Sequence, residues 1–212
     1  MISVEIFCDS KENCNTYLVM KDDYAILIDP ANNVKHLNKY LEGKSLVAVL
    51  LTHGHYDHFK TLEEILKIYD VPCYLQKRAK DKIFDLNASY AKVFGCNKVP
   101  SVDQTKFVFV NDNDSIEIAN FTIKVLYTPG HTDDSVCYII DNFFFSGDTL
   151  FKNSVGRTDL ITGNTFKLGQ SLVKIKNLKQ DYIIYPGHDG TTSLSSEKKN
   201  LSLIHISEPT RH

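Results

Sequence analysis

One short segment of the sequence, residues 52–59 (THGHYDHF), holds four potential metal ligands. They are His53, His55, Asp57 and His58. Zinc in catalytic sites is bound by imidazole nitrogens and carboxylate oxygens, while one coordination position stays open for water. The apolar run LVAVLL comes directly before the segment and predicts a buried strand. The pattern therefore predicts a catalytic metal site at the end of a strand.

Three more apolar segments end in a residue that could bind a metal. They are IKVLYTPGH, NFFFSGD and DYIIYPGH, which end in His131, Asp148 and His188. If the four strands run in compatible directions, their ends gather at one edge of the fold. The seven residues are then enough for two metal ions. Two metals about 3.5–4 Å apart can share a bridging carboxylate, and Asp148 suits that place because a carboxylate has two oxygens.

The elements that must position these residues follow from the apolar pattern. Alternation predicts a hairpin around Asp22-Asp23 near the start of the chain, and residues 77–95 fit two short helices or an irregular insert. Strands are expected over residues 3–7, 15–20, 24–30, 46–51, 71–76, 106–110, 114–118, 121–129, 135–140, 142–148 and 181–188, and helices over 33–43, 61–70 and 164–176. Strands cluster in each half of the chain, with helices between them. This order predicts an α/β fold of four layers (αββα), with two sheets packed together and helices outside.

Composition narrows the class of protein. The 212 residues are 42% hydrophobic and 24% charged, with a formal net charge of -2. Basic residues are scattered and no apolar run reaches the length of a membrane span, so we expect neither nucleic-acid nor membrane partners. The N-terminus shows no export signal, and the five cysteines are odd in number without a CxxC pair. Free thiols in the cytoplasm are therefore the expectation.

The end of the chain differs in character from the rest. Residues 201–211, LSLIHISEPTR, resemble the in-frame translation of a transposase-based sequencing adapter. We therefore expect one domain over residues 1–200 and a non-native tail over 201–212, and we leave the histidines of the tail out of the site. A genuine amphipathic tail is the alternative.

The order of the seven residues resembles the motif of the metallo-β-lactamase-fold hydrolases, over residues 2–200. The resemblance implies an αββα sandwich of two mixed sheets flanked by helices, and two divalent metals, zinc or else iron or manganese. It divides the ligands between the metals: His53, His55 and His131 on the first, Asp57, His58 and His188 on the second, and Asp148 bridging. The carboxylates Asp57 and Asp148 are then the expected catalytic residues.

Within that family, TPGHT, FSGDTLF and GRTDL resemble glyoxalase II most closely. The resemblance implies a small-molecule thioester substrate of the S-acylglutathione kind. It also implies that Arg157 contacts the glutathione, with a loop-fixing salt bridge to Asp159 as the alternative. The sequence departs from glyoxalase II at Asp159 and Gly190, where that family has tyrosines, and it lacks the helical C-terminal domain.

A hydrolytic mechanism follows from the expected metals. Metal binding lowers the pKa of water to about 7, so a metal-bound hydroxide can attack the substrate carbonyl at neutral pH. A thiol has a pKa of about 8.5 and can leave as a thiolate without a strong general acid. An amide nitrogen needs a proton first, and no dedicated acid stands out. Thioesters or lactones are therefore favoured over amides.

Several alternatives stay open at this point. Thr52, Thr132 and Asp29 could support the histidine loops, or they could be ordinary loop hydroxyls and a turn aspartate. A mononuclear-iron persulfide dioxygenase of the same fold, a lactonase and a non-enzymatic metal-binding module are the competing functions. The oligomeric state is not indicated by the sequence.

Overall fold

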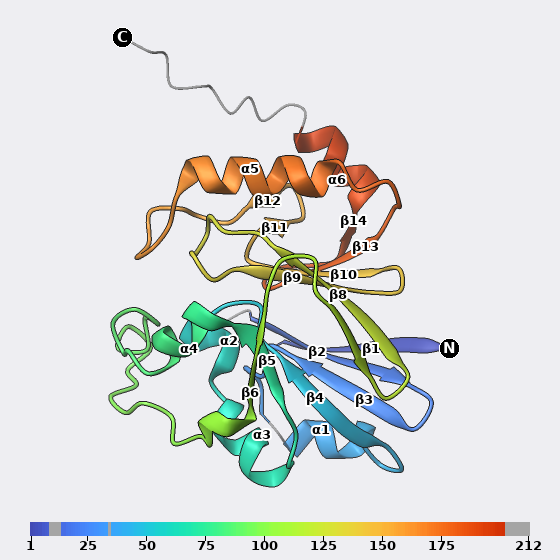
Figure 1. Ribbon diagram of the computed structural model, residues 1–212, viewed down its shortest axis with the longest axis vertical. Coiled ribbons are helices and arrows are strands. Elements are labelled where there is room, and N and C mark those ends of the chain that lie inside the picture. The colour runs from blue at the N-terminus through green and yellow to red at the C-terminus, as the bar shows by residue number, and fades with distance from the viewer. Residues whose placement is uncertain (9–13, 34, 202–212) are drawn as a thin grey trace.

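The computed structural model of the chain describes residues 1–8, 14–33 and 35–201. The tail predicted at 201–212 lies outside these residues except for Leu201, so its origin stays a prediction. The described chain forms two six-stranded sheets, one two-stranded ribbon and helices on both outer faces (Figure 1).

The first sheet is built from the N-terminal half of the chain. Its strands, in spatial order, are β1 (Ile2–Cys8), β2 (Asn15–Lys21), β3 (Tyr24–Ile28), β4 (Ser45–Leu50), β5 (Cys73–Gln76) and β6 (Phe107–Val110). The first three pair antiparallel, and β3 to β6 pair parallel. The predicted turn at Asp22 is confirmed, and its positive φ of 52° is a conformation that aspartate tolerates well.

The second sheet comes from the C-terminal half. Its spatial order is β14 (Thr192–Ser193), β13 (Ile183–Pro186), β10 (Phe143–Gly147), β9 (Val136–Ile140), β8 (Phe121–Tyr127) and β7 (Ser115–Ile118). Only β10 and β13 pair parallel, so this sheet is mixed as well. A small ribbon of β11 (Leu150–Phe151) and β12 (Ser154–Val155) follows β10.

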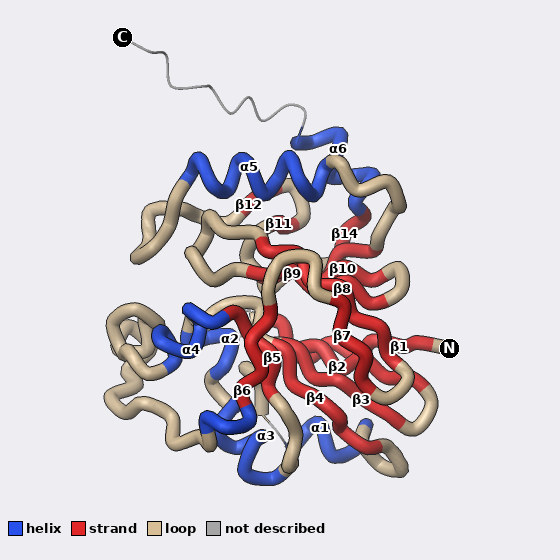
Figure 2. The backbone as a smooth tube through the Cα atoms, viewed as in Figure 1, coloured by secondary structure: helices blue, strands red, loops and turns tan. Residues whose placement is uncertain are grey.

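Helices cover the two outer faces, as the tube view also shows (Figure 2). The first sheet carries α1 (Lys35–Tyr40), α2 (Tyr56–Phe59), α3 (Leu62–Ile68) and α4 (Lys77–Ile83). The second carries α5 (Thr165–Lys176) and α6 (Leu194–Leu201). A 3-10 turn, Gln104–Lys106, leads into β6. None of the helices in the described part of the chain is long and apolar enough to cross a membrane.

Three apolar cores hold the four layers together. Between the sheets, Tyr17 and Leu50 pack in one cluster with Tyr138 and Phe145. Leu18, next to Tyr17 on the same strand, belongs instead to the core under α3. Neighbouring strand residues point to opposite faces, so each buried strand serves two cores. A third cluster packs the second sheet against α5 and α6. The predicted four-layer sandwich is confirmed.

The predicted secondary structure differs from the observed one in three places. Residues 181–188 were expected to be the last strand, but β14 and α6 follow. The β11–β12 ribbon was also missed, because two-residue strands leave no alternating pattern. Residues 77–95 form one helix, α4, followed by a series of turns, so the insert is half helical and half irregular.

Candidate metal centre

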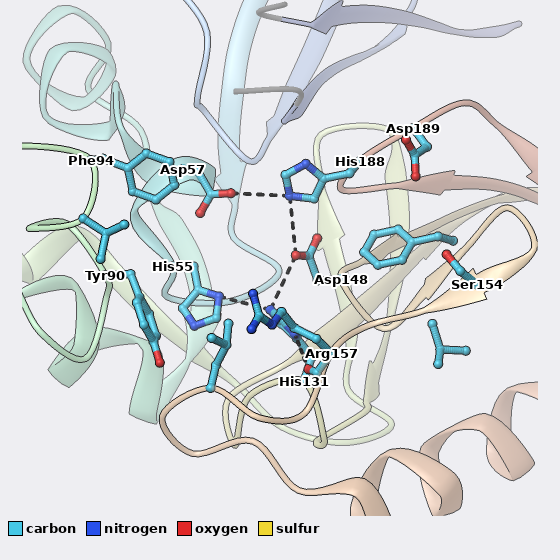
Figure 3. Close-up of a pocket in the computed structure, with 14 residues that line it drawn as sticks. His55, Asp57, Tyr90, Phe94, His131, Asp148, Ser154, Arg157, His188 and Asp189 are labelled. Carbon is cyan, nitrogen blue, oxygen red and sulfur yellow. Dashed lines mark hydrogen bonds and ion pairs between the residues drawn. The ribbon is translucent and has the colours of Figure 1, made fainter. Parts of the chain in front are cut away.

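The loops after four strands meet at one edge of the sandwich (Figure 3). The loop after β4 and the short helix α2 that follows it carry four of the predicted residues, and the loops after β8, β10 and β13 carry one each: His53, His55, Asp57 and His58, then His131, Asp148 and His188. Both sheets therefore contribute to one cluster, as the strand ends predicted.

Three histidines form the first group. His53, His55 and His131 each offer a ring nitrogen, and these atoms lie within 4.8 Å of one another. Nε2 of His53 lies 3.1 Å from Nδ1 of His55, and Nε2 of His131 lies 3.0 Å from the same atom. All three rings are buried. Three imidazoles facing one point are a ligand set that zinc, iron or copper accepts.

The second group joins carboxylates to histidines. Nε2 of His188 lies 3.4 Å from Oδ2 of Asp57, and Nε2 of His58 lies 3.7 Å from the same oxygen. Asp148 lies between the groups. Its Oδ1 is 3.3 Å from Nε2 of His58, and its Oδ2 is 3.4 Å from His131 and 3.5 Å from His188. One carboxylate therefore reaches both groups.

Unpaired polar atoms show that the cluster suits a metal. Nε2 of His55, Nε2 of His58 and Oδ1 of Asp148 are buried without a hydrogen-bond partner among the described residues. A buried polar atom without a partner costs about 1–3 kcal/mol, so such atoms are rarely left unused. Nε2 of His58 and Oδ1 of Asp148 lie 3.3 Å apart inside the cluster, where a bound cation would satisfy both, whereas His55 faces the cluster with its Nδ1. The histidine and aspartate cluster is therefore able to bind metal ions.

Hydrogen bonds behind the rings fix which nitrogen faces the cluster. Asp29 accepts from both the backbone and the hydroxyl of Thr52, and its Oδ2 lies 2.9 Å from Nδ1 of His58. Because a carboxylate only accepts, Nδ1 of His58 is the donor and Nε2 is turned inward. Thr52 Oγ1 lies 3.1 Å from Nδ1 of His53 and orients that ring in the same way. The predicted supporting roles of Asp29 and Thr52 are confirmed.

Two further predictions about supporting residues have different outcomes. Thr132 pairs with Ser135 through their hydroxyls at 2.7 Å, so of the two alternatives for this residue the structure supports the loop hydroxyl. His131 is held instead by a carbonyl, because its Nδ1 donates to Arg157 O at 2.9 Å.

Electrostatics separate the two groups. Burial lowers the pKa of His53, and burial with the neighbouring His131 lowers the pKa of His55 to about 3, so both rings are neutral and ready to bind a metal. Burial also lowers the pKa of His188, but Asp148 and Asp57 outweigh it and raise that pKa to about 9. The pKa of Asp148 lies well below its ordinary value, because His58 and His188 outweigh the opposing effect of burial. In the second group, protons therefore occupy the positions that a metal would take.

The difference in pKa between the histidines of the two groups predicts that metal uptake depends on pH. His188 must lose its proton to bind a metal, so below pH 9 protons compete with the ion. We expect the apparent affinity of the second group to rise about tenfold or more per pH unit between pH 7 and 9. A chelator competition at three pH values, corrected for the protonation of the chelator, measures this slope. An affinity that stays constant over this range would contradict the charged state assigned to His188.

Comparison with known proteins places the chain in a family. The profile described as "Metallo-beta-lactamase superfamily" matches residues 10–188. The chain belongs to this superfamily. The protein "Probable metallo-hydrolase YqgX" of Bacillus subtilis (strain 168) is 31% identical over 192 residues, covering 87% of this chain and 89% of that protein. A hydroxyacylglutathione hydrolase of Francisella philomiragia is 32% identical over 178 residues, covering 82% of this chain and 62% of that enzyme.

Solved structures agree with this assignment. The BLEG-1 B3 metallo-beta-lactamase superposes with a TM-score of 0.82 at 29% identity, covering 96% of this chain and all of that one. TTHA1623 in a di-iron-bound form gives a TM-score of 0.80 at 27% identity, covering 93% of this chain and 98% of that one. The metallo-beta-lactamase fold and the metal-binding cluster thus occur together here, while the identity of the metal is not fixed by the family.

A glycine lets the loops of this metallo-beta-lactamase site approach closely. A methyl group at Gly187 would overlap Oδ1 of Asp148 and lie 2.6 Å from Cε1 of His58. We expect Gly187→Ala to lower the free energy of unfolding by about 1–3 kcal/mol and to weaken metal binding, because both side chains must move. Urea denaturation and metal analysis measure the two effects. Gly190→Ala is the matched control, since a methyl group there meets nothing within 4 Å. Equal behaviour of the two variants would contradict the close approach.

A buried ion-pair network ties the histidine loops to α4. Lys82 is 5% exposed, and its ammonium group donates to Asp134 and, at 2.6 Å, to Asp133. The other oxygen of Asp134 accepts from the backbone of Gly54 at 2.7 Å, between His53 and His55. Asp134 thus connects the loop after β8 with the loop after β4.

Arg157 lies at the mouth of the cavity. Its guanidinium group makes two hydrogen bonds of 2.7 Å to the carboxylate of Asp159, so the alternative of a loop-fixing salt bridge is confirmed. Arg157 also lines the cavity of about 490 Å³ that opens onto the cluster. Its predicted contact with substrate stays a prediction, because pairing with Asp159 does not exclude it.

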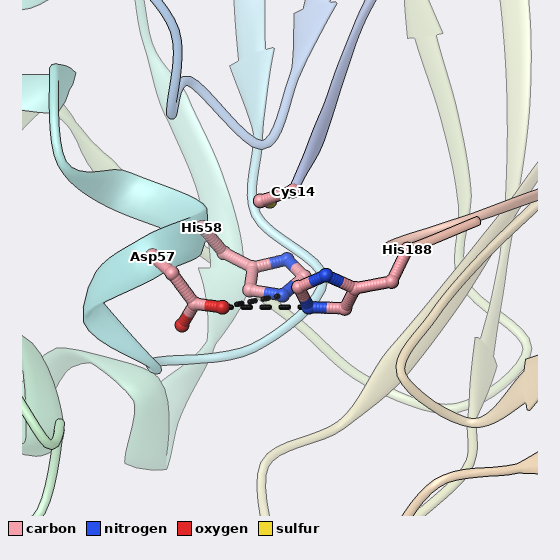
Figure 4. A group of neighbouring side chains, drawn as sticks. All are labelled: Cys14, Asp57, His58 and His188. Carbon is pink, nitrogen blue, oxygen red and sulfur yellow. Dashed lines mark ion pairs between the residues drawn. The ribbon is translucent and has the colours of Figure 1, made fainter. Parts of the chain in front are cut away.

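Cys14 is a residue of the site that sequence reasoning missed. Its sulfur lies within 4.8 Å of ligand atoms of Asp57, His58 and His188 (Figure 4), and its backbone bridges to that of His188. Burial raises the pKa of its thiol to about 12. No spacing pattern indicates this contact, because it is made by a single residue at the start of β2, far from the histidines in sequence. Lys82 and Asp134 were missed for the same reason.

Proposed function

We propose that the protein is a dinuclear metal-dependent hydrolase that cleaves thioesters. The observation that supports this most is the position of Asp148 between two ligand groups, with Oδ1 at 3.3 Å from Nε2 of His58 and Oδ2 at 3.4 Å from Nε2 of His131. In this assignment His53, His55 and His131 would hold the first metal, Asp57, His58 and His188 would hold the second, and the carboxylate of Asp148 would be shared between them. Zinc fits these ligands, as do iron and manganese.

The chain contributes the orientation of the ligand side chains. Bound divalent metals would activate a water molecule at neutral pH and polarise a substrate carbonyl. Asp29, Thr52 and the carbonyl of Arg157 hold the rings so that the same nitrogens stay turned inward. The cavity above the cluster admits a small molecule, since ligand pockets typically measure about 300–1,000 Å³.

The choice of thioester rests on the lack of a protonated carboxyl group among the described residues of the metal centre. The pKa values of Asp57 and Asp148 are lowered, because neighbouring histidines outweigh burial, so neither carboxyl group holds a proton at neutral pH. A thiolate can leave without protonation, whereas an amine cannot. The hydroxyacylglutathione hydrolase among the relatives supports the same reaction class.

A mononuclear-iron dioxygenase is less well supported. A single iron ion would leave the residues of the second group without a function. Nε2 of His58, which belongs to that group, would stay buried without a hydrogen-bond partner. The experiment that separates the two is a measurement of metal stoichiometry and thioester hydrolysis on one preparation of the full chain. Two metals per chain with turnover of S-lactoylglutathione or a simpler thioester support the hydrolase. One iron per chain with oxygen consumption and no hydrolysis would exclude it.

A further inference from the structure

One wall of the cavity is apolar and exposed. Tyr90, Val93 and Phe94, from the turns that follow α4, line the cavity beside His55 and Asp57 (Figure 3). The side chain of Val93 is 77% exposed and that of Phe94 is 42% exposed. A single exposed apolar residue needs no explanation, but these lie together over a candidate metal centre.

The wall is held firmly in place. The ring of Tyr90 meets that of His55 edge to face at 5.3 Å, and its hydroxyl accepts from Ile161 N at 2.7 Å across the cavity. Tyr90 has a positive φ of 60°, which is costly for an aromatic residue and is found mainly at functional positions. Phe94 packs against Tyr56 at a ring distance of 5.9 Å. An apolar surface is thus fixed directly beside a candidate metal ligand.

The side chains that line the cavity offer an anionic substrate little cationic charge besides the metals. Arg157 is the one basic residue among the described residues that line it, apart from the histidines of the cluster, and Asp159 neutralises it. Asp189 adds a carboxylate on the opposite side (Figure 3). A glutathione thioester carries carboxylate groups and a net negative charge, and a carboxylate that bound Arg157 would have to displace Asp159.

We infer that the cavity takes an uncharged thioester with an apolar chain of several carbons, packed against Tyr90, Val93 and Phe94. The inference rests on the proposed function, and it names the substrate class of the same site. The apolar chain of the substrate can belong to its acyl group or to its thiol, because either arrangement keeps the scissile carbonyl at the metals. Each buried methylene then adds binding energy that is realised beside the reacting centre.

The test compares chain lengths on the metal-loaded protein. We expect kcat/KM for S-acyl-N-acetylcysteamines to rise from acetyl to octanoyl, by about fourfold at most per methylene, and to exceed that for S-lactoylglutathione. A parallel series of S-alkyl thioacetates tests the thiol side. A rise in either series supports the inference. Flat values in both, or a preference for S-lactoylglutathione, would overturn it.

Variants locate the apolar chain. Val93→Ser and Phe94→Ala should each lower the ratio of the octanoyl to the acetyl kcat/KM by about tenfold. Val173→Ser and Phe166→Ala are the matched controls, because both side chains are exposed on α5 outside this cavity, and they should leave the ratio unchanged. An unchanged ratio in the first pair would overturn the inference.

Binding of alkyl hydroxamates separates this inference from the proposed function. These metal chelators need no turnover, so their affinities can be measured by calorimetry even if no thioester is cleaved. Tighter binding of octanohydroxamate than acetohydroxamate, lost in Phe94→Ala, supports the apolar site whatever the reaction. Equal binding together with thioester hydrolysis would leave the hydrolase in place and exclude the apolar site.

Discussion

Asp148→Asn is expected to lower thioester hydrolysis roughly a thousandfold and to reduce the metal content below two ions per chain. Its carboxylate reaches His131 on one side and His58 and His188 on the other, so the first and second groups share it. An asparagine keeps the shape but loses the charge and one accepting oxygen. Several kcal/mol of transition-state stabilisation depend on the metals, and about 1.4 kcal/mol corresponds to a factor of ten.

Asp189→Asn is the matched control for this change. Asp189 lines the same cavity next to His188 but belongs to neither ligand group. Its positive φ of 66° is tolerated by asparagine, so the control should fold normally. Metal content and kcat/KM, measured on both variants, test whether the two ligand groups share Asp148. Full activity of an Asp148→Asn protein with two metals would exclude the bridging role.

Lys82→Met is expected to lower the free energy of unfolding of the metal-free protein by about 3–5 kcal/mol. The change leaves the carboxylate of Asp134, which is completely buried, without its cation. A buried charge without a partner destabilises the folded state far more than the intact ion pair stabilises it, because the charge stays desolvated and no attraction offsets that penalty. Since Asp134 also holds Gly54, the His53 and His55 loop should loosen, and metal should be lost from the three-histidine group first.

The control for Lys82→Met lies on the same helix. Lys77 is exposed at the start of α4, so Lys77→Met should change stability by no more than about 0.5 kcal/mol. Urea denaturation of both metal-free variants gives the two values. If Lys82→Met is as stable as the parent protein, the network does not hold the loops, and another cause must be sought for the order of the site.

The ligand cluster was predictable because each ligand follows an apolar strand. An apolar run sets the strand, and a short loop leaves the residue after it little freedom, so the sequence placed His131, Asp148 and His188 at strand ends, where the structure has them. Asp29 was predictable for the same reason, since it ends β3 beside β4. The four layers followed from the clustering of strands in each half of the chain.

The contacts that the sequence did not predict are made over long separations by single side chains. Lys82 and Asp134 are 52 residues apart, and neither belongs to a motif. Cys14, which directly precedes β2, lies beside the second group. The exposed wall at Val93 and Phe94 lies in turns without periodicity, so only its position beside the cavity reveals it. Packing, rather than local pattern, decides all three.

The division of the ligands between the two sheets also orders events during synthesis. The first four ligand residues leave the ribosome within one short stretch, but neither group is complete until a residue of the second sheet has emerged. The three-histidine group must wait for His131, and the other group must wait for His188, near the end of the described chain. Domains generally fold as units while the chain is made. A nascent chain of this protein therefore cannot acquire its full metal complement until both sheets are assembled, so metal loading would report that translation and folding have finished.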